Sequence, residues 1–228
     1  MDVTRSMPMN NVTTFLAHAQ TPAEFAQRYF AYIPSLLQRI DLTALTAWIE
    51  ILEMARQRHR TIFVAGNGGS ASTAAHMATD FGYGLPMGAG SQPVRMVALT
   101  ENLATVTALA NDRGYSNVFV SQLRVLYRPG DVLIVVSASG NSPNVVAAAA
   151  GVKERKGAVL GLLGFDGGEL LKRCDVAVHV KTPTGEYGPV EDVHLILNHL
   201  MSLWLRHQAA SRSREAPRAH RNHVRVRP

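Results

Sequence analysis

The chain has 228 residues, which is enough for one domain with a sizeable apolar core and too few for two large ones. Apolar residues make up 46% and charged residues 18%, and no run approaches the roughly 20 apolar residues that a membrane-spanning helix requires. The N-terminus lacks the apolar stretch of a signal peptide, and the single cysteine, Cys174, excludes an internal disulfide. We therefore expect a cytoplasmic protein with no membrane partner.

The net charge of +6 lies mostly at the C-terminus. Residues 211–228 hold six arginines against one acid, Glu215, which accounts for +5 of the +6. Because this segment has almost no apolar content, residues 209–228 are expected to form a disordered basic tail. The alternative is a tail that binds polyanions. The remaining body is close to neutral, so nucleic acid is not an expected partner of the domain.

The first part of the chain predicts a loose arm followed by helices. Residues 1–20 show no clear pattern, whereas apolar residues recur at helical spacing over 22–39 and 42–58. Thr21, followed three residues later by Glu24, is typical of a helix start. Two leading helices of this kind usually seek other helices, so we expect them to build an oligomer interface.

From residue 61 onward, predicted strands and helices alternate. Strands are expected at 61–65, 94–99, 131–136, 158–163 and 176–180, and helices at 70–82, 103–110, 116–127, 143–156, 168–173 and 190–208. The strands are continuous apolar runs, which is typical of strands covered on both faces. The alternation indicates a doubly wound, parallel α/β sheet in a single domain over residues 21–208.

A glycine-rich loop, Gly66 to Ser70 (GNGGS), follows the first predicted strand and opens a helix. Glycines let a ligand approach the backbone closely, and the helix N-terminus offers free N–H groups to an anion. The loop also satisfies the dinucleotide-binding pattern, but the nearest suitable acid, Glu101, lies some 30 residues on instead of about 20. A plain tight turn is the third interpretation.

A second loop, Ser137 to Ser142 (SASGNS), follows the strand at 131–136 and leads into a helix that begins at Pro143. Its three hydroxyls and its backbone N–H groups would make a cradle for a phosphomonoester without Lys or Arg. A dinucleotide enzyme has no use for this second cradle. Simple helix capping explains at most one of the three serines.

Four sequence blocks now carry a family resemblance: GNGGS-x-x-x-A-x-H at 66–76, ALAND at 108–112, GDVLIVVSASGNSPNVVAA at 130–148 and GxxGGEL at 164–170. In order and spacing they resemble the sugar isomerase (SIS) domain proteins of the phosphoheptose isomerase group, from about residue 22 to 205. The resemblance implies a flavodoxin-like fold, a homotetramer with sites at subunit interfaces, and isomerisation of D-sedoheptulose 7-phosphate to D-glycero-D-manno-heptose 7-phosphate through an enediol.

The resemblance also implies a set of substrate-binding residues. Ser137, Ser139 and Ser142 would hold the sugar phosphate, and Asn67 and Ser70 would contact the sugar chain. The remaining implied substrate-binding positions are Gly68, Glu101, Asn111, Asp112 and Asn141.

Enediol isomerisation needs a base near carbon, an acid near the oxygens and stabilisation of the developing oxyanion. The candidates for catalysis are Asp80, Glu191 and His199, and together with His76 they form a candidate zinc site with nitrogen and oxygen ligands. His76 and Asp80 are four residues apart on a helix and so point the same way; a surface pair without chemistry is the alternative. Eight helical residues rise ~12 Å, so Glu191 and His199 share an ion only if Glu191 reaches in from the helix start.

The chain departs from the family pattern at the predicted reaction centre. Asp80 stands where Glu is usual, and Glu191 stands where Gln is usual. One interpretation is an active isomerase in which the shorter Asp80 is balanced by the longer Glu191; the other is a changed substrate or lost catalysis. Further departures are Glu101 for Asp, Asp192 for Glu and Pro189 for Arg.

Three functions remain open from the sequence. An isomerase is favoured because both His76 and His199 are present, and a scaffold needs neither. The others are a protein-binding scaffold, similar to the replication initiator-associating protein, and a SIS-domain sensor or isomerase of another sugar phosphate. His179, His194 and Cys174 are expected to be structural residues.

Overall fold

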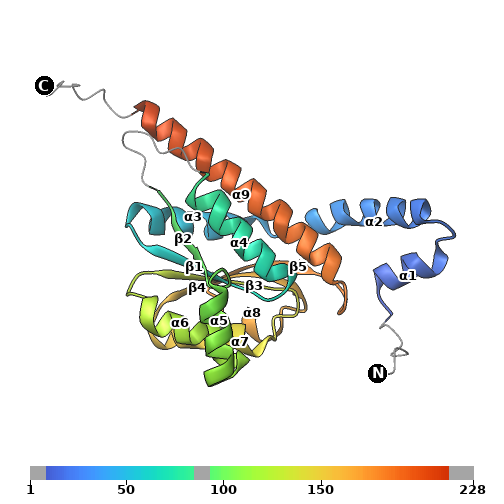
Figure 1. The fold of residues 1–228 in the computed structure, drawn as a ribbon. Coiled ribbons are helices and arrows are strands. Elements are labelled where there is room, and N and C mark those ends of the chain that lie inside the picture. The colour runs from blue at the N-terminus through green and yellow to red at the C-terminus, as the bar shows by residue number, and fades with distance from the viewer. Residues whose placement is uncertain (1–8, 85–92, 216–228) are drawn as a thin grey trace, which may run out of the picture.

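The computed structural model describes residues 9–84 and 93–215. At its centre lies a five-stranded sheet in the order β2-β1-β3-β4-β5, in which all neighbouring strands are parallel (Figure 1). The strands are β1 (Thr61–Ala65), β2 (Arg95–Ala98), β3 (Val132–Ser137), β4 (Ala158–Phe165) and β5 (Val176–Lys181). The predicted doubly wound parallel sheet is confirmed, and its strand order is the flavodoxin-like one.

Helices cover both faces of this sheet (Figure 1). One face carries α3 (Leu42–Gln57), α4 (Gly69–Gly82) and α9 (Tyr187–Glu215). The other face carries α5 (Leu103–Arg113), α6 (Val118–Leu126), α7 (Pro143–Glu154) and α8 (Gly168–Leu171), with a short 3-10 turn at Tyr115–Asn117.

Alternate residues of each strand enter two separate apolar layers. In β3, Ile134 and Val136 pack on the side of α3, α4 and α9, while Leu133 and Val135 pack on the side of α6 and α7. All four side chains are fully buried. A strand covered on both faces has no position for a polar side chain, which is why the predicted strands are unbroken apolar runs.

The ends of several predicted elements differ from the structure. The strand predicted at 94–99 is Arg95–Ala98, and the helix predicted at 103–110 continues to Arg113. The short helix predicted at 168–173 ends at Leu171. The last helix, predicted at 190–208, begins at Tyr187 and continues to Glu215.

The predicted loose arm at 1–20 was wrong for its second half, which forms α1 (Asn11–His18). Three helices therefore precede the first strand among the described residues, because α2 (Pro22–Leu37) and α3 follow as predicted. The buried carboxylate of Glu186 holds this region: it accepts the Asn11 backbone N–H at 2.7 Å and the Tyr32 hydroxyl at 2.7 Å. Because Glu186 is more than 150 residues away from Asn11 and Tyr32 in the sequence, no local pattern indicated this support for α1. Residues 1–8 lie outside the described part.

The predicted disordered tail at 209–228 was likewise wrong at its start, because residues 209–215 continue α9. Ala209 is buried one helical turn after the buried Leu205, so the packed face of the helix extends past residue 208. Residues 216–228 lie outside the described part. None of the described helices combines the length and apolar character needed to cross a bilayer.

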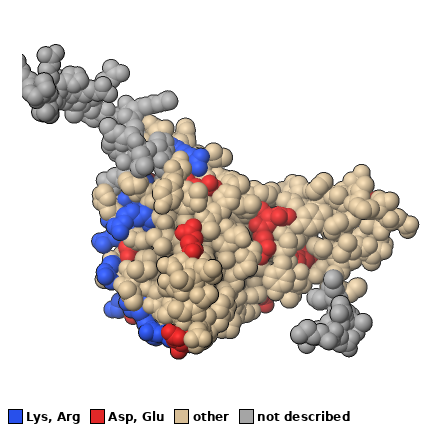
Figure 2. Space-filling model, viewed as in Figure 1, with Lys and Arg blue, Asp and Glu red and all other residues tan. Residues whose placement is uncertain are grey.

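Helices α1 and α2 project away from the sheet and its covering helices (Figure 1). Leu36 is the only buried residue of α2, and the ring of Phe30 is 70% exposed. The visible face of this projection shows no Lys or Arg (Figure 2). A projecting pair of helices with so little burial of its own gains stability from packing against further surface.

His194 anchors α9 to the sheet from a fully buried position. Desolvation lowers the pKa of its imidazole from the ordinary 6.5 to about 4, with a smaller contribution from His179. The expectation that His194 is a packing residue agrees with this burial.

We expect His194 to make the protein acid-sensitive. Between pH 6.5 and about 4, the unfolded chain binds a proton at this residue while the folded chain does not, so stability is lost as the pH falls through this window. The pKa difference of about 2.5 corresponds to roughly 3 kcal/mol. In urea unfolding at pH 7 and pH 4.5, His194→Leu should lose less stability than the wild type. The exposed His18→Gln is the control, and equal losses for all three proteins would contradict the assignment.

Candidate active site

The two predicted loops meet where the sheet changes direction. β1 pairs with β2 on one side and with β3 on the other, so the chain runs outward from β1 to β2 and then returns to β3. Ligands of doubly wound sheets bind outside the carboxyl ends of the strands at such a point. The first loop follows β1, the second follows β3, and both line one cavity of about 260 Å³.

The first loop is built for close approach to the backbone. Gly68 precedes α4 with a φ of 54°, a conformation that favours glycine, and it leaves the first N–H groups of α4 without a side-chain cap. Asn67 makes a reciprocal pair of 2.8 Å amide hydrogen bonds with the buried Asn144 of α7, and its Oδ1 also accepts the Tyr115 hydroxyl at 2.9 Å. The carboxamide of Asn67 thus ties the two loops together.

The second loop supplies hydroxyls at the start of α7. The Ser137 hydroxyl oxygen accepts the Gly140 N–H at 3.0 Å and that of Ser139 accepts the Asn141 N–H at 3.3 Å, so each hydroxyl keeps its proton to donate. Ser142 is the N-cap residue, but its side chain does not cap the helix. All three serines line the cavity, together with Ser70. Two helix N-termini and several hydroxyls around one cavity favour an anion.

Glu191 lies in this same cavity. Its carboxylate is so close to Gly69 that a Cβ there would be 2.1 Å from the Glu191 Oε2 atom, so a larger residue at position 69 would displace it. Burial raises the pKa of the Glu191 carboxyl, and the negative charge of Asp192 raises it further. Glu191 therefore takes up a proton more readily than an ordinary glutamate.

A second group of polar side chains lies further along α4 and α9. The Nε2 atoms of His76 and His199 are 3.1 Å apart, and Asp80 Oδ2 lies 3.2 Å from the first and 3.9 Å from the second. The side chain of Asp80 is 19% exposed, against 42% for His76 and 49% for His199. These three residues, brought together from two helices, can hold a divalent metal ion.

The structure does not bring Glu191, the fourth predicted metal ligand, into this group. Helices α4 and α9 lie side by side (Figure 1) and both begin at the cavity, where Gly69 meets Glu191. His76 is seven residues beyond Gly69 and His199 is eight beyond Glu191, a rise of about 11–12 Å in each helix. The site therefore has two ends. One is a cavity suited to an anion at the helix starts, and the other is the His/Asp group two to three turns further along the two helices.

Four predicted substrate-binding residues lie outside the cavity lining. Glu101, Asn111 and Asp112 are exposed, and the amide of Asn111 donates to Asp112 at 2.9 Å. Asn141 is also exposed and holds the second loop to α8, because its Oδ1 accepts the Glu169 N–H at 2.9 Å.

Sequence reasoning missed several residues at the site. Tyr187 lines the cavity from the first turn of α9, which the predicted helix did not include. Asn144 and Tyr115 hold Asn67, and Asn198 donates to Asp80 at 2.8 Å. An asparagine after the second loop was a weak signal for Asn144, whereas nothing local identifies a contact across more than 100 residues.

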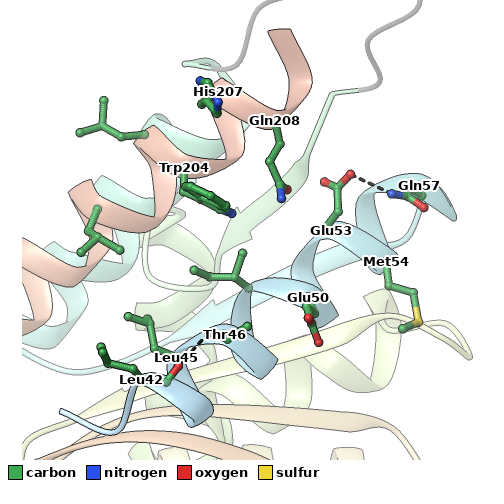
Figure 3. A pocket seen from close by; sticks show the side chains of 13 residues that line it. Leu42, Leu45, Thr46, Glu50, Glu53, Met54, Gln57, Trp204, His207 and Gln208 are labelled. Atoms are coloured by element: carbon green, nitrogen blue, oxygen red, sulfur yellow. Dashed lines mark hydrogen bonds between the residues drawn. The ribbon is translucent and has the colours of Figure 1, made fainter. Parts of the chain in front are cut away.

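A separate groove of about 1330 Å³ lies between α3 and α9 (Figure 3). Its walls are mainly apolar, and Figure 3 shows Trp204 of α9 pointing into the space between the two helices. The exposed Leu200, Leu203 and Trp204 follow His199 on the same helix. The groove offers few groups for chemistry and is a candidate packing surface.

The comparisons with known proteins agree with this geometry. The SIS domain family matches residues 28–164. The phosphoheptose isomerase of Nitratidesulfovibrio vulgaris strain Miyazaki F is 36% identical over 189 residues, which cover 82% of this chain and 84% of that protein. The phosphoheptose isomerase of Aromatoleum aromaticum is 37% identical over 171 residues, which cover 72% and 85% of the two chains.

Solved structures give the same answer. The phosphoheptose isomerase of Neisseria gonorrhoeae superposes with a TM-score of 0.72 and 31% identity, over 81% of this chain and 98% of that one. The enzyme of Francisella tularensis has a TM-score of 0.73 at 22% identity, over 82% and 100%, and supports the fold. The SIS domain match covers more than half of this chain, and the matches to relatives above 30% identity cover most of the length of those relatives. This chain therefore belongs to the phosphoheptose isomerase group of the SIS domain family.

Proposed function

We propose that this chain isomerises D-sedoheptulose 7-phosphate to D-glycero-D-manno-heptose 7-phosphate in the cytoplasm. The observation that carries the proposal is the two-ended site on α4 and α9. The cavity at the helix starts suits the phosphate, and the His/Asp group lies about 11–12 Å of helix rise away, a span comparable with an extended seven-carbon sugar chain. The relatives named above, all phosphoheptose isomerases, support the same activity.

At the phosphate end, the hydroxyl groups of Ser137, Ser139 and Ser142 donate hydrogen bonds to the phosphate oxygens. The free N–H groups at the start of α7 add to this binding. Glu191 in the same cavity has a raised pKa, and an entering phosphate raises it further because the two anions repel.

At the other end, Asp80 accepts the proton of the substrate carbon and returns it to the neighbouring carbon, while His199 moves the proton between the two oxygens. Proton transfer by positioned groups of this kind contributes about 10²–10⁴-fold to the rate. His76 holds both of these groups, since its Nε2 faces His199 at 3.1 Å and Asp80 at 3.2 Å.

We also propose that His76, Asp80 and His199 hold a zinc ion. Ligand atoms bound at 2.0–2.1 Å around a tetrahedral zinc lie about 3.4 Å apart, and the three distances here are 3.1, 3.2 and 3.9 Å. Three protein ligands leave a fourth position for substrate, as in catalytic zinc sites. When bound, the ion supplies Lewis-acid polarisation of the substrate oxygens.

Exchange with solvent tests the reaction directly. Incubated with sedoheptulose 7-phosphate in D₂O, with and without added zinc, the protein should form the aldose and place deuterium at C2, as read by NMR. His199→Ala should lower the exchange rate at least ~100-fold and leave sugar-phosphate binding nearly intact. Loss of binding instead would refute the role given to His199. No exchange by the wild type, with this or other ketose phosphates, would favour the binding-scaffold function.

The phosphate position has its own test. Ser139→Ala should weaken sugar-phosphate binding about 10-fold or more by calorimetry, because a hydrogen bond to a charged group is worth about 1.5–3 kcal/mol. Ser35→Ala, whose hydroxyl donates to a carbonyl within α2, is the control. An unchanged dissociation constant for Ser139→Ala would place the phosphate elsewhere.

Assembly into a homotetramer completes the proposal. Leu203 and Trp204 are exposed in the groove between α3 and α9. Helices α1 and α2 project from the rest of the protein and bury few of their own side chains. Exposed apolar surface bordered by polar residues is typical of protein–protein contacts. The exposed Glu101, Asn111 and Asp112 would then reach a substrate at a subunit boundary.

A charge in the groove should break the assembly. Trp204→Glu is expected to give a smaller species than the wild type in analytical ultracentrifugation, since a buried unpaired carboxylate is costly. Val125→Glu, on the exposed side of α6, is the control and should leave the mass unchanged. A wild-type mass of 24.8 kDa would show that the chain is monomeric.

A further inference from the structure

Asn198 is a buried polar residue that the reaction described above does not use. It lies on α9 next to His199, with no exposed surface, between the buried Leu197 and Met201. Its Nδ2 donates to Asp80 Oδ2 at 2.8 Å, and its Oδ1 accepts no hydrogen bond from the described residues. Asparagine is a poor helix former, and burying its carbonyl oxygen without a hydrogen bond costs free energy of folding. Stability alone therefore does not favour Asn at this position.

The contact that Asn198 makes is with the centre of the His/Asp group. The oxygen that accepts its N–H, Asp80 Oδ2, is the same one that lies 3.2 Å from His76 and 3.9 Å from His199. The backbone of Asp80 is held from α9 as well, because its carbonyl accepts the Arg206 Nη2 at 3.4 Å. Helix α9 thus fixes this aspartate at both the carbonyl and the carboxylate.

We propose that Asn198 is a positioning residue, whose amide fixes the Asp80 carboxylate so that one oxygen stays with the two histidines and the other remains for the substrate. This inference rests on the proposed role of Asp80. A carboxylate has two nearly equivalent orientations about its terminal bond. A short side chain at the base position cannot adjust its reach, and a displacement of about 1 Å at a reacting group can cost about 100-fold in rate.

The same contact serves a bound cation. Carboxylates that ligate metals are usually oriented by a hydrogen bond from outside the ligand set, and loss of that partner typically costs about 10–100-fold in metal affinity or activity. Asn198 is the side chain that holds the Asp80 carboxylate in this way from the interior, while the two histidines lie on its exposed side.

Asn198→Leu tests the proposal because it removes the amide and keeps the volume. We expect kcat to fall about 10–100-fold with little change in KM for the sugar phosphate, and the affinity for Co²⁺ in a chelator competition to fall about 10-fold or more. The melting temperature should stay the same or rise, since a half-satisfied polar group is replaced by an apolar one. Asn198→Asp keeps the shape but places a second carboxyl group beside Asp80 in place of the amide, and it should lose at least as much kcat.

Met201→Leu, one turn further on the same buried face, is the control and should keep kcat, KM and Co²⁺ affinity. Wild-type kcat and Co²⁺ affinity in Asn198→Leu would overturn the positioning role while the isomerase function stands. If the wild type turns over no ketose phosphate, the proposed function fails, and Co²⁺ affinity alone decides for or against Asn198. A wild type that neither reacts nor binds Co²⁺ would overturn both.

Discussion

The parallel packing of α4 and α9 on one face of the sheet determines where Glu191 and the His/Asp group lie relative to each other. Both helices begin at the carboxyl ends of the strands, where Gly69 is in close contact with Glu191. A Cβ at this position would meet the carboxylate and displace it from its place in the cavity. With the starts aligned, helical rise brings His76 opposite His199. Asp80 lies one turn beyond His76, and its carboxylate accepts the hydrogen bond from Asn198. The substrate site that we propose is thus a strip along two helices, with a phosphate end and a reaction end.

Electrostatics differ sharply between the two ends. The proposed phosphate end offers helix N-termini, hydroxyls and one carboxyl with a raised pKa, without any Lys or Arg in the cavity lining. Neutral donors of this kind bind an anion while keeping their geometry, because they belong to short loops held by internal hydrogen bonds, such as the one from the Gly140 N–H to the Ser137 hydroxyl oxygen. The proposed reaction end contains two histidines and an acid, whose nearest side-chain atoms lie 3.1 to 3.9 Å from one another.

Sequence patterns predicted the sheet and both loops because these features are local. A strand covered on both faces must be apolar throughout, and a loop that opens a helix shows its glycines or serines in one short run. The alignment of Glu191 with Gly69 is not local, so the sequence could include Glu191 among the metal ligands although the structure holds it two turns away. Asn198 and Tyr115 gave no signal for the same reason, since their partners lie 118 and 48 residues distant.

The buried Glu186 connects the beginning of the chain to this strip. Its two oxygens are satisfied by Asn11 and Tyr32, and it comes directly before Tyr187, which opens α9 and lines the cavity. A shortened protein lacking the first 32 residues would leave that carboxylate without these donors, five positions before Glu191. The N-terminal helices are therefore part of the scaffold that holds the first turn of α9 beside the cavity, and an expression design that trims them would remove hydrogen-bond donors on which this scaffold depends.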